Sequence, residues 1–291
     1  MHARAVAAIT TALLGTAALL LPGSDARAGD IDGRPLVIGH RGASAYAPEN
    51  TLVSIDKAAR LGIPWVENDV QRTKDGELVV IHDDSLQRTT DVEKVFPGRT
   101  SWKVKDFTAA EIARLDAGSW FSHRYAGTRV PTLEQYMRRI EHNHQKLLLE
   151  IKNPQLYPGI EQQTLKLLSN EGWLDRQHLA DRLIVQSFSA DSLRIVHDLK
   201  PAVHTAFLGT PRISELAAYA RFTDGVNPSF GSISTGYVSA VHAFKGPHGK
   251  PLNVFTWTVN DAGTAWRATR YGVDGIITNE PDVVETELQE P

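Results

Sequence analysis

Residues 65–70 read Trp65-Val66-Glu67-Asn68-Asp69-Val70, a short run that is apolar at both ends and carries two carboxylates. Alternate side chains of a β-strand point to the same face, so Glu67 and Asp69 share one face of this run. Burying two acids on one face is costly unless each has a partner, such as a metal ion or a cation. The run therefore predicts a buried strand with a functional site at its end.

Short runs of this kind recur along the chain, and most are followed by a segment with helical spacing. They lie at 36–39, 65–70, 147–151, 183–186, 204–208, 225–227, 254–257 and 273–278. Eight such repeats predict an α/β protein, a (β/α)₈ TIM barrel, with an open doubly wound sheet as the alternative. We prefer the barrel because the ionisable residues cluster at or just after the ends of the runs, where barrel enzymes carry their sites.

One segment departs from this alternation. Residues 78–81 are strand-like, but only 73–76 separate them from the preceding strand, which is too short for a parallel crossover. We therefore expect an extra β-hairpin, and its register places His82 opposite residues 67–69. From about residue 83 to 130 the chain loses the pattern, which predicts an inserted segment after the second strand that covers the site.

Residues 1–28 have the features of a signal peptide: a short basic start, an apolar stretch and the small-x-small sequence Ala26-Arg27-Ala28. We expect one barrel domain over 29–291, which is secreted or associated with the cell envelope. A membrane anchor is the alternative, but the apolar stretch ends at Pro22, short of the about 20 residues that span a bilayer. We therefore expect no stable membrane insertion.

The composition limits the partners of this protein. The chain has no cysteine, so an exported protein of this sequence relies on its core rather than on disulfides. Its net charge is −3 and no basic stripe is present, which argues against a nucleic-acid partner. The oligomeric state is left open by these features.

Several charged residues are expected at the same end of the barrel. Glu67, Asp69 and Glu150 form an oxygen-rich set suited to one divalent cation, Ca²⁺ or Mg²⁺, rather than to Zn²⁺. Extracellular calcium concentrations favour Ca²⁺, and Mg²⁺ is the alternative. A plain salt-bridge cluster of these acids with Arg41 and Lys152 is the competing interpretation.

His40 and His82 are the candidates for general acid and base, since imidazole exchanges a proton near neutral pH. Arg41 offers a planar fork for phosphate oxygens and Lys152 a point charge. Glu49 and Asn50 are expected to belong to the loop and helix start, with a supporting contact to Arg41. Together these residue types point to metal-assisted cleavage of a phosphate ester.

The chain resembles the secreted bacterial type of the glycerophosphodiester phosphodiesterase family over almost all of residues 29–291. The similarity lies in successive motifs: Val37-Ile38-Gly39-His40-Arg41-Gly42, Pro48-Glu49-Asn50-Thr51, Val66-Glu67-Asn68-Asp69-Val70, Thr73-Lys74-Asp75-Gly76, Ile81-His82-Asp83, Arg88-Thr89-Thr90, Leu149-Glu150-Ile151-Lys152, Gln186-Ser187-Phe188, Trp257-Thr258-Val259-Asn260 and Gly272-Val273-Asp274-Gly275. Two positions depart from the family: Asn68 replaces a usually apolar residue, and Asn279 stands where Asp is frequent.

The resemblance implies a role for each candidate residue. His40 and His82 would be the acid/base pair, Glu67, Asp69 and Glu150 the metal ligands, and Arg41 and Lys152 the phosphate contacts. Phe188 and Trp257 would line the site near the glycerol end of the substrate, with ordinary barrel core as the alternative for both.

The expected reaction is metal-dependent hydrolysis of a small-molecule glycerophosphodiester to sn-glycerol 3-phosphate and an alcohol. The family's likeness to phosphatidylinositol phospholipases suggests that the glycerol 2-hydroxyl attacks first and gives a cyclic phosphate. One alternative is the same scaffold acting on a lysophospholipid or on a polyglycerolphosphate wall polymer. The other is a catalytically silent extracellular binding protein, which loss of a histidine or a carboxylate would have favoured.

Overall fold

The computed structural model describes residues 33–289, so the predicted signal peptide lies outside the described residues. The strands in this range are β1 (Leu36–Gly39), β2 (Trp65–Arg72), β3 (Leu78–Val80), β4 (Lys146–Ile151), β5 (Leu183–Ser187), β6 (His204–Leu208), β7 (Gly225–Asn227), β8 (Asn253–Thr256) and β9 (Gly275–Thr278). All but β3 run parallel, and β1 pairs with both β2 and β9. The sheet therefore closes on itself, which confirms the predicted (β/α)₈ barrel.

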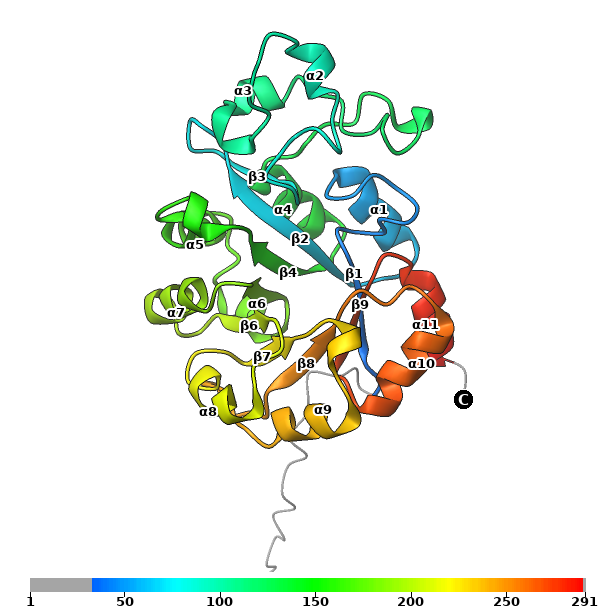
Figure 1. Cartoon of the computed structure of the whole chain (residues 1–291), viewed down its shortest axis with the longest axis vertical. Helices are drawn as coiled ribbons and strands as arrows, with labels where there is room; N and C mark the ends of the chain where they lie inside the picture. The colour runs from blue at the N-terminus through cyan, green and yellow to red at the C-terminus, as the bar shows by residue number, and fades with distance from the viewer. Residues whose placement is uncertain (1–32, 290–291) are drawn as a thin grey trace, which may run out of the picture.

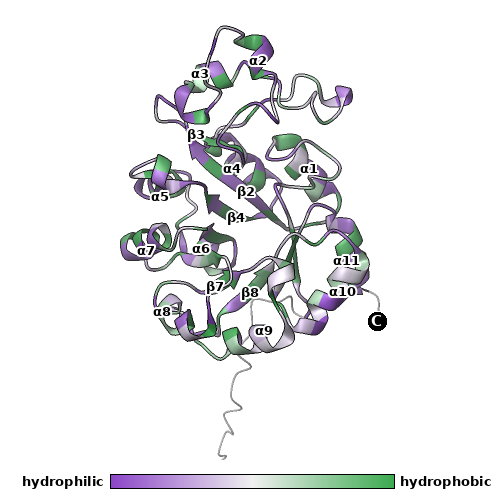
Figure 2. Cartoon of the chain, viewed as in Figure 1, coloured by the Kyte–Doolittle hydropathy of each residue, from purple (hydrophilic) through white to green (hydrophobic). Residues whose placement is uncertain are grey.

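Helices surround the closed sheet, and Figure 2 shows both hydrophobic and hydrophilic residues on them. The helices around the barrel are α1 (Leu52–Arg60), α4 (Leu133–His142), α5 (Ile160–Asn170), α6 (Arg176–Asp181), α7 (Ala190–Leu199), α8 (Leu216–Tyr219), α9 (Thr235–His242), α10 (Ala262–Tyr271) and α11 (Pro281–Gln289) (Figure 1). Their apolar faces pack on the outer face of the strands in one large core. None of the helices in the described part of the chain is long and apolar enough to cross a membrane.

The barrel interior is divided into an apolar and a polar region. Ile38, Trp65, Leu148, Phe255 and Ile277 form one apolar cluster. Because alternate residues of a strand share a face, Glu67 and Asp69 follow Trp65 on the same face of β2. The start of the barrel is thus filled with apolar side chains, and acids occupy its carboxyl end.

The predicted hairpin is confirmed by the antiparallel pairing of β2 with β3, in which Val70 lies opposite Val80. The Ile81 amide donates to the Asp69 carbonyl over 2.9 Å, so this pairing continues to the residue before His82. Because Val70 lies opposite Val80 in an antiparallel pair, His82, two residues after Val80, falls opposite Asn68, two residues before Val70. The expected approach of His82 to the acids of β2 is therefore correct.

The chain between β3 and α4 forms a lobe at the upper end of Figure 1, which contains α2 (Val92–Val95) and α3 (Ala109–Ile112). It also contains the 3₁₀ turns η1 (Val104–Asp106) and η2 (His123–Tyr125); further such turns are η3 (Pro154–Leu156), η4 (Ile213–Glu215) and η5 (Phe230–Ser232). A separate apolar cluster that includes Leu86, Phe107 and Leu115 fills the lobe. The insertion after the second strand is thus present and has a core of its own.

Candidate active site

Three carboxylates meet at the carboxyl end of two adjacent strands. Asp69 of β2 is paired in register with Glu150 of β4, and Glu67 precedes Asp69 on the same face. One oxygen from each of the three acids lies within 4.8 Å of the others, and all three side chains are buried. The structure therefore brings together the acids that the sequence singled out.

Two cations lie against these acids. The Lys152 Nζ is 3.3 Å from Asp69 Oδ1 and 3.0 Å from Glu150 Oε1, and the Arg41 Nε is 3.3 Å from Asp69 Oδ2. The Arg41 backbone amide donates to Glu67 Oε2 over 2.9 Å. The ion pairs of the competing salt-bridge interpretation are present, and both cations touch the carboxylate of Asp69.

Two positive charges do not fully balance three buried acids. Burial and the neighbouring Asp69 and Glu150 raise the pKa of Glu67 well above its usual range. Burial and Asp69 likewise raise the pKa of Glu150, to about 8. Burial also acts to raise the pKa of Asp69, but Lys152 and Arg41 hold it well below its usual value. A divalent cation would supply the missing charge, so this donor set fits a hard metal ion with oxygen ligands.

A tight turn after β1 aims Arg41 at the acids. Arg41 has a φ of +54°, a left-handed conformation that non-glycine residues adopt rarely. The next residue, Gly42, has a φ of +85°, and a Cβ there would lie 2.3 Å from Ser54 Oγ. Ser54 also donates to the Arg41 carbonyl over 2.8 Å. Glycine is thus required for this turn to pack on α1.

His40 is hydrogen-bonded to an amide rather than to a carboxylate. Its Nδ1 lies 2.6 Å from Asn279 Oδ1, which also accepts from Ser44 Oγ at 2.9 Å. Since an amide oxygen only accepts, Nδ1 carries the proton and Nε2 is left as an acceptor. Burial, and then the charge of Arg41, lower the pKa of His40 to about 4. His40 is therefore neutral near pH 7.

His82 has the opposite kind of partner. Its Nδ1 lies 2.6 Å from Asp83 Oδ1, and Arg88 Nε donates to the other oxygen of Asp83 over 2.7 Å. Arg88 also binds both oxygens of Glu49, which in turn accepts from Arg41 Nη1 at 2.8 Å. Burial lowers the pKa of His82, while Asp69 and Asp83 oppose that shift. An ion-pair chain thus runs from the histidine to the phosphate-binding candidate Arg41.

Phe188 and Trp257 lie together at the mouth of the barrel. Their ring centroids are 5.8 Å apart in an edge-on arrangement, and Lys152 Nζ is 5.4 Å from the Phe188 centroid. Phe188 is 51% exposed, so the core alternative is wrong for this residue. Trp257 is partly buried, packs on the apolar cluster of the barrel interior, and donates through Nε1 to the Asn227 carbonyl over 2.7 Å.

Several residues of the site were not assigned a role from the sequence. Asn50 Nδ2 donates to Asp69 Oδ2 over 2.8 Å, and the Asn50 backbone amide donates to the Arg41 carbonyl over 3.0 Å, so Asn50 contacts both the acid and, as expected, Arg41. The expected contact of Glu49 with Arg41 is present. Gln186 Nε2 lies 3.4 Å from Glu67 Oε1 inside the barrel. Gln186 and Arg88 lie within family motifs, and this was the only sequence feature that pointed to a role for them. Their partners are distant in sequence, so no local pattern predicts the contacts.

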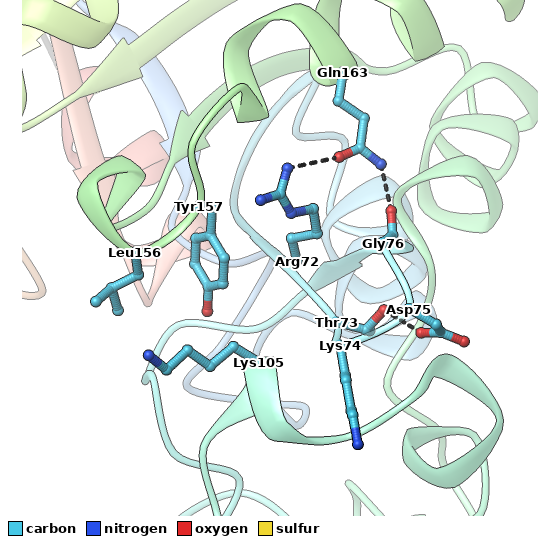
Figure 3. A pocket seen from close by; sticks show the side chains of 9 residues that line it. All are labelled: Arg72, Thr73, Lys74, Asp75, Gly76, Lys105, Leu156, Tyr157 and Gln163. Atoms are coloured by element: carbon cyan, nitrogen blue, oxygen red, sulfur yellow. Dashed lines mark hydrogen bonds between the residues drawn. The ribbon is translucent and has the colours of Figure 1, made fainter.

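A pocket of about 490 Å³ lies at the end of β2, beyond the acids. Figure 3 shows Arg72, Tyr157 and Gln163 around it, with Gln163 bonded to Arg72. Lys74 and Lys105 also line the pocket. Three basic side chains and one acid, Asp75, therefore line this pocket, together with uncharged residues.

Buried acids, paired cations and imidazoles at the carboxyl ends of barrel strands place this chain among the barrel enzymes that act on phosphate esters. Residues 40–283 match the model of the glycerophosphoryl diester phosphodiesterase family. The chain belongs to this family, and the prediction that it is a phosphodiesterase of this kind is confirmed.

Individual relatives agree with this assignment. A glycerophosphodiester phosphodiesterase of Bacillus subtilis is 35% identical over 86% of this chain and 85% of its own length. One from Caldanaerobacter subterraneus is 35% identical over 86% of this chain and 96% of its own. A solved phosphodiesterase of Oleispira antarctica, in complex with the product sn-glycerol-3-phosphate, has a TM-score of 0.76 and 28% identity, and the match covers 89% of this chain and 98% of that one.

Proposed function

We propose that this protein hydrolyses glycerophosphodiesters to sn-glycerol 3-phosphate and an alcohol, with one divalent cation and two histidines. The observation that carries the proposal is the convergence of three buried carboxylates within 4.8 Å of one another at the carboxyl end of the barrel. Family membership supports the reaction class, and the product bound to the Oleispira antarctica structure supports the glycerol phosphate half.

Glu67, Asp69 and Glu150 would hold the cation. When bound, it supplies Lewis-acid polarisation of the phosphate oxygens and lowers the pKa of an attacking hydroxyl. All three donors are carboxylate oxygens, which suit both Ca²⁺ and Mg²⁺. We favour Ca²⁺, with Mg²⁺ as the alternative, because extracellular calcium concentrations match weak sites of this kind.

Arg41 and Lys152 would bind the phosphate. Both already lie beside the acids, at 3.3 Å from Asp69, and both side chains are less than a fifth exposed. Partial burial strengthens their attraction for an anion, and charge that develops on the phosphate in the transition state would be stabilised by the same two groups. Phe188, next to Lys152, would contact the apolar edge of the glycerol.

The two histidine partners suggest different roles. His40 is neutral with a free Nε2, so it is suited to accept the proton of the attacking hydroxyl. His82 lies against the carboxylate of Asp83, which stabilises an imidazolium, so it is suited to protonate the leaving alkoxide. We therefore assign His40 as the base and His82 as the acid.

The deciding experiment follows glycerol 3-phosphate release from glycerophosphocholine by the purified protein, with EDTA and with Ca²⁺ or Mg²⁺ restored. We expect release only with metal, and its loss in His40→Ala and Glu150→Gln. The exposed His142→Ala is the matched histidine control and should keep full activity. Metal-independent release would contradict the proposed cofactor, and no release with any metal would contradict the substrate. Equal turnover of a 2-deoxyglycerol analogue would contradict initial attack by the 2-hydroxyl.

A larger anionic substrate is a second candidate, because a pocket lined by Arg72, Lys74 and Lys105 lies at the end of the strand that carries Asp69. A polyglycerolphosphate polymer would place a second phosphate beyond the reacting one. We expect Lys74→Ala with Lys105→Ala to weaken turnover of polymer and to leave that of glycerophosphocholine unchanged. Equal effects on the two substrates would contradict this candidate.

We also propose that the protein is exported, on the basis of the sequence of residues 1–28. The protein would then act outside the cell or in its envelope. N-terminal sequencing of the protein from culture medium and from cells tests this, with a start near Gly29 as the expected result.

A further inference from the structure

A second group of metal-ligating side chains lies at the other end of the barrel. His204 is the first residue of β6, and Asp224 directly precedes β7. His248 lies in the segment between α9 and β8, which an isolated bridge between Lys245 and Pro251 closes into a hairpin. Because the barrel strands are parallel, the starts of β6 and β7 lie opposite the ends of β2 and β4 that carry the active-site acids.

The two imidazoles contact different oxygens of the same carboxylate. His248 Nδ1 lies 2.7 Å from Asp224 Oδ1, and His204 Nδ1 lies 3.4 Å from Asp224 Oδ2. The two ring centroids are 4.1 Å apart. One donor atom from each residue falls within 4.8 Å of the other two, so a small adjustment of the rings suffices for all three to reach one ion.

The backbone around Asp224 holds this arrangement in place. The Thr205 amide donates to Asp224 Oδ2 over 3.1 Å, and the Asn253 amide donates to the Asp224 carbonyl over 2.9 Å. A Cβ on Gly246 would lie 2.8 Å from the Thr223 carbonyl oxygen and 3.1 Å from Asp224 Oδ1. Glycine at 246 therefore lets the hairpin approach the carboxylate closely enough to bring His248 to it.

Charge and exposure also suit a bound cation. Burial acts to raise the pKa of Asp224, but hydrogen bonds from His204 and His248 hold it below its usual value, so the carboxylate is ionised. Its side chain is 14% exposed, whereas those of His204 and His248 are 28% and 26% exposed. An ion can therefore enter from solvent and retain water as a further ligand.

A neighbouring pair shows what is particular to this cluster. Asp274 precedes β9 much as Asp224 precedes β7, and it binds a single histidine, His242, at 2.8 Å. It also accepts from the Val254 amide over 2.8 Å. A single histidine, at the end of α9, is enough to connect that helix to the amino-terminal end of the barrel at Asp274. The second histidine at Asp224 is therefore more than such a structural hydrogen bond requires.

We propose that His204, Asp224 and His248 form a site for Zn²⁺, with the two Nδ1 atoms and one carboxylate oxygen as ligands and water completing a tetrahedron. Two imidazole nitrogens and one carboxylate suit zinc, whereas the three carboxylates of the active site suit Ca²⁺ or Mg²⁺. The two sites would thus select different metals. The zinc ion would fasten the hairpin that carries His248 to the starts of β6 and β7 and stabilise the folded protein.

The test titrates Co²⁺ and Zn²⁺ into metal-free protein with Glu150→Gln, which weakens the carboxylate site. Co²⁺ serves as a visible-absorption probe and Zn²⁺ is followed by calorimetry. We expect one equivalent to bind, the cobalt spectrum to be that of a tetrahedral ion with nitrogen ligands, and Zn²⁺ to raise the Tm. Adding His248→Ala should weaken binding by roughly tenfold or more, since one of three protein ligands is lost.

Matched variants keep the test decisive. His142→Ala removes an exposed histidine elsewhere and should leave zinc binding unchanged, and His204→Asn should weaken binding as His248→Ala does. In the otherwise unaltered protein, His248→Ala should retain phosphodiesterase activity, and its Tm, lowered in EDTA by the lost hydrogen bond to Asp224, should no longer rise when Zn²⁺ is added. Zinc binding that survives both His204→Asn and His248→Ala, or an absence of binding in the Glu150→Gln protein, would overturn the proposal.

Discussion

Arg88 and Asp83 form a two-point ion pair, with Arg88 Nε 2.7 Å from Oδ2 and Nη2 3.0 Å from Oδ1. The same guanidinium binds both oxygens of Glu49, and Asp83 accepts from His82. One arginine of the insertion thus sets the position of two carboxylates: Asp83, which contacts the proposed general acid His82, and Glu49, which contacts Arg41. The insertion therefore contributes to the geometry of the site.

Replacing Arg88 by Lys should lower kcat/KM by about 10- to 100-fold, because a point charge cannot hold two carboxylates in a fixed plane. The reduction should fall mainly on kcat, since the proposed metal and phosphate ligands are retained. Steady-state kinetics on glycerophosphocholine measure it. Lys94→Ala, an exposed cation of the same insertion, is the control. Unchanged kinetics in Arg88→Lys would show that the ion pairs have no positioning role.

Replacing Asn279 by Asp should raise the pKa of His40, which lies near 4 with the amide as partner. A carboxylate at hydrogen-bond distance stabilises the imidazolium and should raise this pKa by about 1–3 units. Because the proposed base acts unprotonated, the acid limb of the pH profile of kcat/KM should move to higher pH. Asn279→Ala removes the hydrogen bond without adding charge and should lower the rate without this shift. An acid limb at the same pH in Asn279→Asp would contradict His40 as the base.

The metal-free protein should lose stability as the pH rises from about 6.5, above which His40 is neutral in both the folded and the unfolded state, to about 8. The folded state raises the pKa of Glu150 to about 8 and that of Glu67 well above its usual range. In this window the folded state binds more protons than the unfolded state, so the free energy of unfolding falls with increasing pH. Thermal unfolding in EDTA measures the trend.

Added Ca²⁺ should raise the Tm more at pH 8 than at pH 5, because the ion competes with protons for the same oxygens. Glu150→Gln is the control, since it removes one of the titrating groups and should flatten the dependence on pH. A calcium effect that is the same at both pH values would argue against the carboxylate site.

Replacing Asn68 by Leu should stabilise the protein by about 1–3 kcal/mol, the usual cost of burying an amide without hydrogen bonds. Asn68 is fully buried, and neither polar atom of its side chain has a hydrogen-bond partner in the described residues. Val66 and Val70 share its face of β2 and belong to the large apolar core. Chemical denaturation measures the change, with Asn68→Asp as the destabilising comparison. A less stable Asn68→Leu protein would show that the amide has a favourable role.

The strands were predictable because each is marked by a short run of apolar residues that can be recognised from neighbouring positions alone. The runs at 36–39, 204–208 and 225–227 coincide with β1, β6 and β7, and the others differ by one or two residues at their ends. The convergence of Glu67, Asp69 and Glu150 was also predictable. Side-chain alternation assigned their faces, and parallel strands place their carboxyl ends at one edge.

The hydrogen-bond partners of His40 and Arg88 could not be predicted, since they depend on which loops meet once the barrel closes. Asn279 reaches His40 across 239 residues of chain because β9 pairs with β1. Arg88 reaches Glu49 because the insertion folds back on the turn after β1. No periodic pattern in the sequence predicts hydrogen bonds of this kind.

The sequence by itself determined which elements form, which faces they bury and which residue types stand at the active end, because propensity and periodicity act over a few neighbouring residues. Only the tertiary structure decided that the amide of Asn279 binds His40 and the carboxylate of Asp83 binds His82. It also decided that His204 and His248 share Asp224 at the amino-terminal end of the barrel. These pairings depend on barrel closure and on the packing of separate loops. They set the charge around each group, and so the protonation states on which the chemistry depends.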